Sequence, residues 1–280
     1  MGNKLKILIA LLVCAVIYSC DVDFSGFIRS TDRVEDRFVQ SIEYNESNPK
    51  EQIIVNSSEY EVLAASDLHV GPTVNTEKLL NLYDASDAVA LILAGDIVSG
   101  RREHYEIFKE LAEEVTKPLL MVTGNHDLYF DGWKSFYEFF GSSTYYFNVT
   151  TPDTSDLYIC LDIGGGTLGK SQLAWLEEVL EQNRENCRYC IVACHVNILR
   201  TRRTSSANPL VEEVACLIDL FAKYNVNLVI TGHDHVQDVA KIGNTTFIIL
   251  DALEDSYSDA GYLKVISNPD TLKYEFIRFD

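Results

Sequence analysis

Basic residues are scarce in this sequence. Its 280 residues include 23 Lys and Arg against 42 Asp and Glu, which gives a formal net charge of −19. A surface of this sign repels a nucleic-acid backbone at long range, and no stretch rich in Lys or Arg offsets it. We therefore expect no nucleic-acid partner, although a small local basic site is compatible with this balance.

A hydrophobic run long enough to span a membrane is also lacking. Lys4 and Lys6 precede an apolar stretch over residues 7–18, whereas a transmembrane helix needs about 20 apolar residues. A positive start followed by a short apolar stretch is typical of a secretory signal peptide.

The end of this stretch suggests a lipid anchor. Residues 17–20 read Ile-Tyr-Ser-Cys, which resembles the lipobox of bacterial lipoproteins, where a small residue precedes the Cys that becomes lipidated. We expect residues 1–20 to be a lipoprotein signal peptide and Cys20 to be the lipidation site. The protein would then be exported and anchored to a membrane, in the periplasm or at the cell surface. The alternative is an ordinary signal peptide that ends near a Cys.

Few cysteines remain beyond this segment. Of seven, Cys14 leaves with the signal peptide and Cys20 carries the lipid, so five remain. The spacing of Cys187 and Cys190 would allow a disulfide in an exported protein. However, most of the five lie in apolar, strand-like runs, where Cys behaves as a small buried hydrophobic residue. We favour that interpretation for all five.

Repeats, low-complexity tracts and internal linkers are absent, so the sequence predicts a tether over residues 21–32 and one domain over residues 33–280. Within it, predicted strands (residues 88–93, 119–122, 157–161, 189–193 and 226–230) alternate with predicted helices (33–44, 103–116, 133–140, 170–182 and 209–224). This alternation favours a layered α/β fold. The strands that follow, over residues 238–242, 245–250, 261–266 and 271–279, suggest antiparallel edges. Residues 51–55 and 60–66 predict a β-hairpin.

Five of the six histidines belong to short polar motifs, and each motif follows a predicted strand. The motifs are Asp67-Leu68-His69, Gly95-Asp96, Gly124-Asn125-His126-Asp127, the isolated His195, and Gly232-His233-Asp234-His235. The carboxyl ends of strands in an α/β sheet gather along one edge, where ligand sites form. Motifs spread over the chain are therefore expected to converge on one site.

The residue types in these motifs suit a metal. Asp67 and His69 are two apart on a segment that we expect to be extended, so both side chains would point the same way; the same holds for His233 and His235. Gly95, Gly124 and Gly232 each precede a candidate ligand, and a glycine there allows a positive φ and a close backbone approach. Carboxylate, imidazole and carboxamide ligands suit Mn, Fe or Zn.

The order of these motifs is similar to that of the calcineurin-like metallophosphoesterases, over about residues 60–250. The resemblance implies an α/β fold, specifically a four-layer α/β/β/α sandwich of two mixed sheets flanked by helices. It also implies two divalent metal ions, which could be Mn, Fe or Zn. Asp67, His69 and His235 would hold the first ion, Asn125, His195 and His233 the second, and Asp96 would bridge the two.

The same resemblance implies an activity. A hydroxide that bridges the two ions would attack a small phosphorylated substrate, either a phosphomonoester or a phosphodiester. His126 would stand near the leaving-group oxygen, and Asp127 would orient it by accepting its ring N–H. Arg101, Arg102 and Arg200 follow two of the motifs and are candidates for binding the phosphate, unless they are solvated loop residues.

The sequence departs from the motifs of two subfamilies, which makes membership of either one less expected. Purple acid phosphatases have a Tyr three residues after the bridging carboxylate, and here Ser99 stands there. Protein Ser/Thr phosphatases continue with Asp-Arg-Gly, whereas Asp96 is followed by Ile97-Val98-Ser99-Gly100. A different class of function also stays open, a non-hydrolytic lipoprotein that binds metal or a phosphorylated ligand on the same fold. The full set of seven ligands favours the enzyme, and metal content would discriminate between the two.

Overall fold

The computed structural model describes residues 32–50, 52–200 and 207–279. The predicted signal peptide, the lipidation site Cys20 and all of the predicted tether except Asp32 lie outside the described residues. Within the described ranges, no helix is both long enough and apolar enough to cross a membrane. The lipid anchor and the domain boundaries therefore stay predictions.

Two mixed sheets form the centre of the fold. One has seven strands, in the order β1 (Ile53–Ile54), β5 (Tyr145–Thr150), β6 (Ser155–Cys160), β7 (Cys190–Ala193), β8 (Leu228–Thr231), β10 (Thr245–Ile249) and β9 (Asp238–Ile242). The other has five, in the order β12 (Leu272–Arg278), β11 (Gly261–Ser267), β2 (Tyr60–Ala65), β3 (Ala90–Ala94) and β4 (Leu119–Val122). Apolar side chains from the inner faces of both sheets pack together between them.

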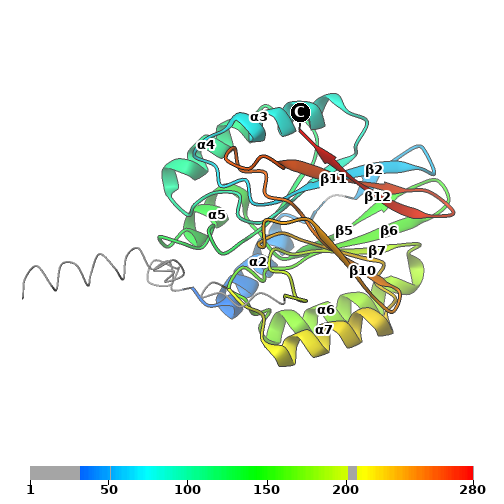
Figure 1. The fold of residues 1–280 in the computed structure, drawn as a ribbon. Coiled ribbons are helices and arrows are strands. Elements are labelled where there is room, and N and C mark those ends of the chain that lie inside the picture. The colour runs from blue at the N-terminus through cyan, green and yellow to red at the C-terminus, as the bar shows by residue number, and fades with distance from the viewer. Residues whose placement is uncertain (1–31, 51, 201–206, 280) are drawn as a thin grey trace, which may run out of the picture.

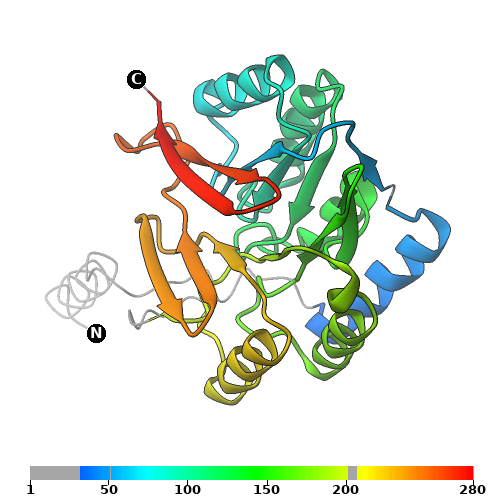
Figure 2. The same ribbon diagram turned by 90° about the vertical axis from the view of Figure 1, so that its right-hand side faces the viewer.

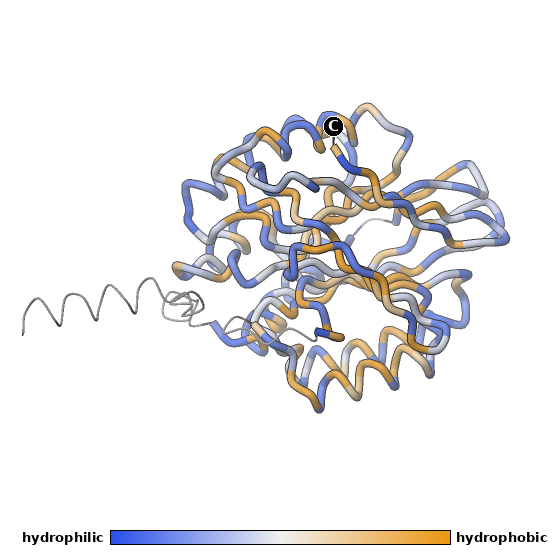
Figure 3. The backbone as a smooth tube through the Cα atoms, in the orientation of Figure 1, coloured by the Kyte–Doolittle hydropathy of each residue, from blue (hydrophilic) through white to orange (hydrophobic). Residues whose placement is uncertain are grey.

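Helices cover both outer faces (Figure 1). The outer face of the five-stranded sheet is covered by α3 (Val74–Ala85), α4 (Arg102–Glu113) and α5 (Trp133–Phe140). The outer face of the seven-stranded sheet is covered by α6 (Lys170–Asn183) and α7 (Val211–Lys223). Hydrophilic and hydrophobic residues alternate along α6 and α7 in Figure 3, as expected of helices with one apolar face. The predicted four-layer α/β/β/α sandwich is confirmed.

The remaining described α-helix, α2 (Val34–Ser47), lies beside α6 at the side of the molecule (Figure 2). Two contacts hold it there. Arg37 donates to Asp162 at 2.6 Å, and both side chains are buried. Phe38 packs edge-on against Trp175, with the ring centroids 6.1 Å apart. The helix is therefore an integral part of the folded unit.

The predicted hairpin over residues 51–66 is wrong. β1 runs parallel to β5 at the edge of the seven-stranded sheet, whereas β2 lies inside the five-stranded sheet between β11 and β3. The polar residues 56–58 reverse the chain, but a turn does not determine which strands pair. β2 has a neighbouring strand on both sides, and nearly every one of its residues is buried, as expected of an interior strand. α3 and β5 were not predicted from the sequence.

The five described cysteines are free. Cys160, Cys187, Cys190 and Cys194 are buried among apolar side chains, as predicted. The prediction is wrong for Cys216, which is exposed on α7.

Parallel pairing brings the motifs together. β2, β3 and β4 run parallel to one another in one sheet, and β7 and β8 do so in the other. The residues that follow these five strands are the polar motifs. The motifs meet where the carboxyl ends of these parallel strands, from both sheets, lie close together. Ligand sites in α/β folds form at such strand ends.

Candidate metal centre

Two groups of side chains at this edge have the geometry to hold a metal ion, and they share one carboxylate. Asp67, His69, Asp96 and His235 form the first group, and Asp96, His195 and His233 form the second. Within each group, one ligand atom from every residue lies within 4.8 Å of the others. The structure therefore brings together all six of the predicted Asp and His ligands.

The backbone of the ligands differs from the prediction. Asp67 and His69 have φ angles of 56° and 46°, and those of His233 and His235 are 71° and 58°. These residues are in the left-handed region, so the predicted extended segments are wrong. Asp96 has φ 51° as well. Non-glycine residues rarely adopt this conformation, and it clusters at functional sites where the surrounding structure enforces it.

The glycines before the ligands serve mainly for close approach. Of the three, only Gly95 has a positive φ, at 86°. A Cβ atom on Gly124 would overlap the carboxylate of Asp96, and one on Gly232 would overlap Ser66 and Asp67. The absence of a side chain at these positions lets the ligand loops pack directly on one another.

Backbone N–H groups fix the two carboxylates. Oδ2 of Asp67 accepts from the N–H of His233 at 2.9 Å, and Oδ1 of Asp96 accepts from the N–H of His126 at 2.7 Å. The second oxygen of each carboxylate faces imidazole nitrogens. Oδ1 of Asp67 lies 3.1 Å from Nε2 of His235, and Oδ2 of Asp96 lies 3.2 Å from Nε2 of His195.

Two buried oxygen atoms in this site have no hydrogen-bond partner among the described residues, Oδ1 of Asp67 and Oδ1 of Asn125. The 3.1 Å contact between Oδ1 of Asp67 and Nε2 of His235 therefore lacks the geometry of a hydrogen bond. Leaving buried acceptors unpaired is costly. A cation beside each oxygen would satisfy it, so the residues present fit a metal centre. Asn125 donates its amide N–H to Tyr129 at 3.1 Å, which leaves its oxygen free for the metal.

The charges of the site also favour a cation. Burial opposes the charged form of Asp67, but His235 and His195 outweigh it and lower the pKa of Asp67 to about 2. Burial likewise opposes the charged form of His195, yet Asp96 and Asp67 raise its pKa to about 9. Burial and the neighbouring His195 lower the pKa of His233 to about 3. Two buried carboxylates thus attract positive charge, which a metal ion can supply in place of a proton.

The ring nitrogens that face away from the centre have partners of their own. Nδ1 of His195 lies 2.9 Å from the carbonyl oxygen of Ala94, and Nδ1 of His235 lies 2.6 Å from the hydroxyl of Tyr257. Such partners fix the orientation of metal-binding imidazoles. Tyr257 was not predicted, because nothing in its spacing from His235 signals the contact.

The family model described as calcineurin-like phosphoesterase matches residues 60–237. This chain belongs to that family. The match covers well over half of the 280 residues and contains every predicted ligand. No curated protein matches the chain.

Solved structures agree with this phosphoesterase fold. A dimetal phosphatase from Danio rerio has a TM-score of 0.63 at 12% identity, covering 78% of this chain and 95% of its own. GAP50, described as the anchor in the inner membrane complex of Plasmodium, has a TM-score of 0.58 at 13% identity, covering 79% and 84%. At these identities the likeness extends to the fold alone.

In this member of the phosphoesterase family, His126 stands beside the ligand groups without belonging to either. Its ring meets that of His69 edge-on, with the centroids 4.5 Å apart, and lies 4.6 Å from the ring of Tyr129. A half-buried imidazole in contact with a candidate ligand is placed to meet a group bound at this site. Its role in leaving-group chemistry stays a prediction.

Asp127 has a different role from the predicted one. Its carboxylate accepts from the backbone N–H groups of Gly124, Val98 and Ile97, at 2.8, 2.9 and 3.3 Å. Asp127 therefore ties the loop after β4 to the loop after β3, and the predicted orientation of His126 by its ring N–H needs correcting. Burial and the nearby Asp96 raise the pKa of Asp127 to about 7. Among the described residues, the carboxylate of Asp127 bonds to these loop N–H groups and not to the ring of His126.

The three candidate arginines differ in what they contact. Both ends of the Arg102 guanidinium pair with Glu138 at 2.7 Å on the surface. Arg200 is buried and pairs with Asp234 at 2.7 Å, between the ligands His233 and His235, so it supports the ligand loop. Arg101 is half-exposed and stacks on Phe130. Substrate binding by Arg101, Arg102 and Arg200 stays a prediction.

Proposed function

We propose that this protein is a metal-dependent phosphoesterase that hydrolyses a phosphomonoester or a phosphodiester of a small phosphorylated substrate. The observation that carries the proposal is the sharing of Asp96 by two groups of metal ligands, next to two buried oxygen atoms without hydrogen bonds. A single structural metal would need one such group. A shared carboxylate is the arrangement of sites with two metals.

The residues that would hold the two ions follow from the geometry. Asp67, His69, Asp96 and His235 would hold the first divalent ion, and Asp96, Asn125, His195 and His233 the second. When bound, such ions lower the pKa of water toward about 7 and offset negative charge on a phosphate. Mn, Fe and Zn all suit this set of nitrogen and oxygen ligands.

The protein's own groups prepare the site for this chemistry. Backbone N–H groups hold Asp67 and Asp96 in one orientation, so their second oxygens point at the metal positions. Asp127 joins the loops after β3 and β4 by hydrogen bonds, which keeps the two ligand groups in fixed positions relative to each other. His126, in contact with His69, can hydrogen-bond to the leaving oxygen or supply its proton.

Artificial substrates test the proposal. The full chain, purified in mild detergent, would be stripped with a chelator and then given Mn, Fe or Zn before assay with p-nitrophenyl phosphate and bis-p-nitrophenyl phosphate. We expect metal-dependent turnover of at least one, and the ratio would assign monoester or diester preference. Folded protein that binds two equivalents of metal but hydrolyses neither would favour the alternative, a lipoprotein that binds a phosphorylated ligand without turnover.

We also propose that a lipid on Cys20 tethers the domain to a membrane. The support is the motif at residues 17–20 and the short apolar stretch before it. A Cys20→Ser variant would separate with the soluble fraction, whereas the parent protein would float with membranes in a density gradient. If the variant floats as well, the lipid anchor is wrong.

A further inference from the structure

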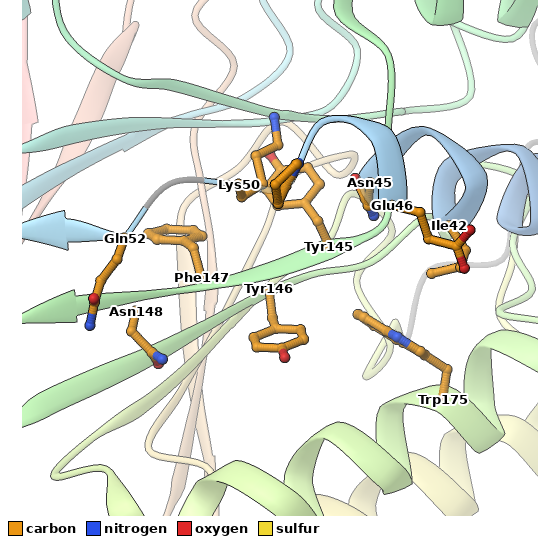
Figure 4. A pocket seen from close by; sticks show the side chains of 11 residues that line it. Ile42, Asn45, Glu46, Lys50, Gln52, Tyr145, Tyr146, Phe147, Asn148 and Trp175 are labelled. Atoms are coloured by element: carbon orange, nitrogen blue, oxygen red, sulfur yellow. The ribbon is translucent and has the colours of Figure 1, made fainter.

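A groove of about 500 Å³ lies at the β1–β5 edge of the seven-stranded sheet (Figure 4). α2, the segment after it, β5 and α6 form its walls. Its volume falls within the ~300–1,000 Å³ that is common for small-molecule sites. The groove contains none of the metal ligands, so the phosphoesterase chemistry does not account for it.

The groove exists because β1 is short. β1 pairs only with Val149 and Thr150 at the end of β5, so it leaves the first part of that strand uncovered. Side chains of both faces of β5 reach the groove from this part. Tyr146, on the face turned toward α6, is 39% exposed, a large aromatic surface in contact with water.

One wall presents two aromatic rings. The ring centroids of Tyr146 and Trp175 are 6.2 Å apart and their planes are inclined by 46°. Phe38 packs edge-on against Trp175 and fixes its indole. Because the two ring planes are not parallel, they cannot stack on both faces of a flat nucleobase. Two inclined faces suit a puckered ring that has C–H groups on its surface.

Polar side chains surround these rings (Figure 4). Asn45, Gln52 and Asn148 carry amides, which both donate and accept hydrogen bonds, and Glu46 adds a carboxylate. Asn45 donates to the carbonyl of Thr144 at 2.7 Å, and its buried Oδ1 has no hydrogen-bond partner in the part of the chain that the structure describes. Hydroxyl groups, which also donate and accept, are the natural partners of such a set.

We propose that this groove binds a short neutral saccharide, with sugar rings packed on Trp175 and Tyr146 and hydroxyls bonded to the amides. A neutral ligand fits better than an anionic one. Glu46 and Lys50 both line the groove, so it carries one charge of each sign, and the Lys50 ammonium already lies 4.5 Å from the ring of Tyr145. The strongly acidic chain also disfavours an anion. The phosphoesterase would thus carry a second, independent site.

Intrinsic fluorescence gives a direct test, since the chain has two tryptophans and Trp133 is only 1% exposed. The full chain would be titrated with glucose, galactose, mannose, N-acetylglucosamine and their common disaccharides. We expect a saturable change with at least one sugar, checked by calorimetry, and little change from Trp133. Tyr146→Ala and Asn148→Ala should each weaken binding by about tenfold, about 1.4 kcal/mol, with phosphoesterase activity unaltered.

Matched controls keep the test decisive. Tyr274 on β12 is 38% exposed, an exposed fraction similar to that of Tyr146, but it lies outside this groove. Tyr274→Ala should therefore bind the sugar as the parent does. Thermal unfolding would establish that the groove variants are folded. No binding of any sugar by the parent protein would overturn the proposal. Undiminished binding by both groove variants would place the sugar elsewhere and overturn it equally.

Discussion

Oδ2 of Asp96 lies 3.2 Å from Nε2 of His195. The same oxygen lies 3.9 Å from Nε2 of His69, in the other ligand group. One carboxylate oxygen therefore faces both candidate metal positions. Burial opposes the charged form of Asp96, but the neighbouring imidazoles, His195 foremost, outweigh it and hold the pKa of Asp96 well below its usual range, so the group is ionised and available to a metal.

Asp96→Asn should therefore lower turnover by more than about a hundredfold, because a neutral amide cannot balance two cations. Metal content, measured by elemental analysis, should fall below two equivalents. Asp87→Asn, at an exposed position, serves as the control and should change neither quantity. Near-normal turnover and metal content in Asp96→Asn would show that Asp96 does not take part in the metal centre.

His126→Ala should lower the catalytic rate by about 10²–10⁴-fold, the range for a proton-transfer group. Metal content should stay unchanged, because His126 belongs to neither ligand group. The catalytic rate and the metal content, measured on one sample, would distinguish a proton-transfer role of His126 from a role as a metal ligand. If metal is lost together with activity, His126 is a ligand and our assignment is wrong.

Tyr257→Phe should weaken metal binding by about 10- to 100-fold, the usual cost of losing a partner of a metal-binding imidazole. The hydroxyl contacts Nδ1 of His235 at 2.6 Å and thereby fixes the ring. Competition with a chelator would measure the affinity. Tyr274→Phe removes a hydroxyl from another part of the surface and should have no effect. Equal affinities in the two variants would show that Tyr257 does not support the centre.

Gly232→Ala should destabilise the fold by about 1–3 kcal/mol, the range for inserting atoms into a packed region, and should also reduce metal binding. The new Cβ would overlap Ser66 and Asp67, so the ligand loops would have to move apart. Gly165→Ala is the matched control, since its Cβ would lie 3.7 Å from its nearest neighbour, Arg37. Urea unfolding would measure both variants, and equal stability would contradict the close packing of these loops.

Much of the fold was predictable because the strands that matter are short apolar runs followed at once by polar motifs. The structure places Asp67, Asp96, Asn125, His195 and His233 directly after β2, β3, β4, β7 and β8. Parallel strands end at a common edge, so the order of motifs along the chain was enough to predict their convergence.

Pairing and backbone conformation were harder to predict. The alternation of Tyr145, Phe147 and Val149 is a signal for β5 that the analysis could have used. In contrast, nothing local shows that β1 joins β5, because pairing depends on distant partners. The left-handed backbone of Asp67 and His69 is imposed by loop packing, including the N–H of His69 bonding to the carbonyl of Asp96 at 3.0 Å. Tyr257 reaches His235 only through the tertiary fold.

The most direct test of the account is to count metal equivalents and turnover in the same sample as metal is returned to the stripped protein. The account predicts that hydrolysis of p-nitrophenyl phosphate or its diester rises to its full value as two equivalents of Mn, Fe or Zn bind per chain. Full turnover in the presence of excess chelator, or with a single equivalent bound, would contradict a centre built from two ligand groups around Asp96.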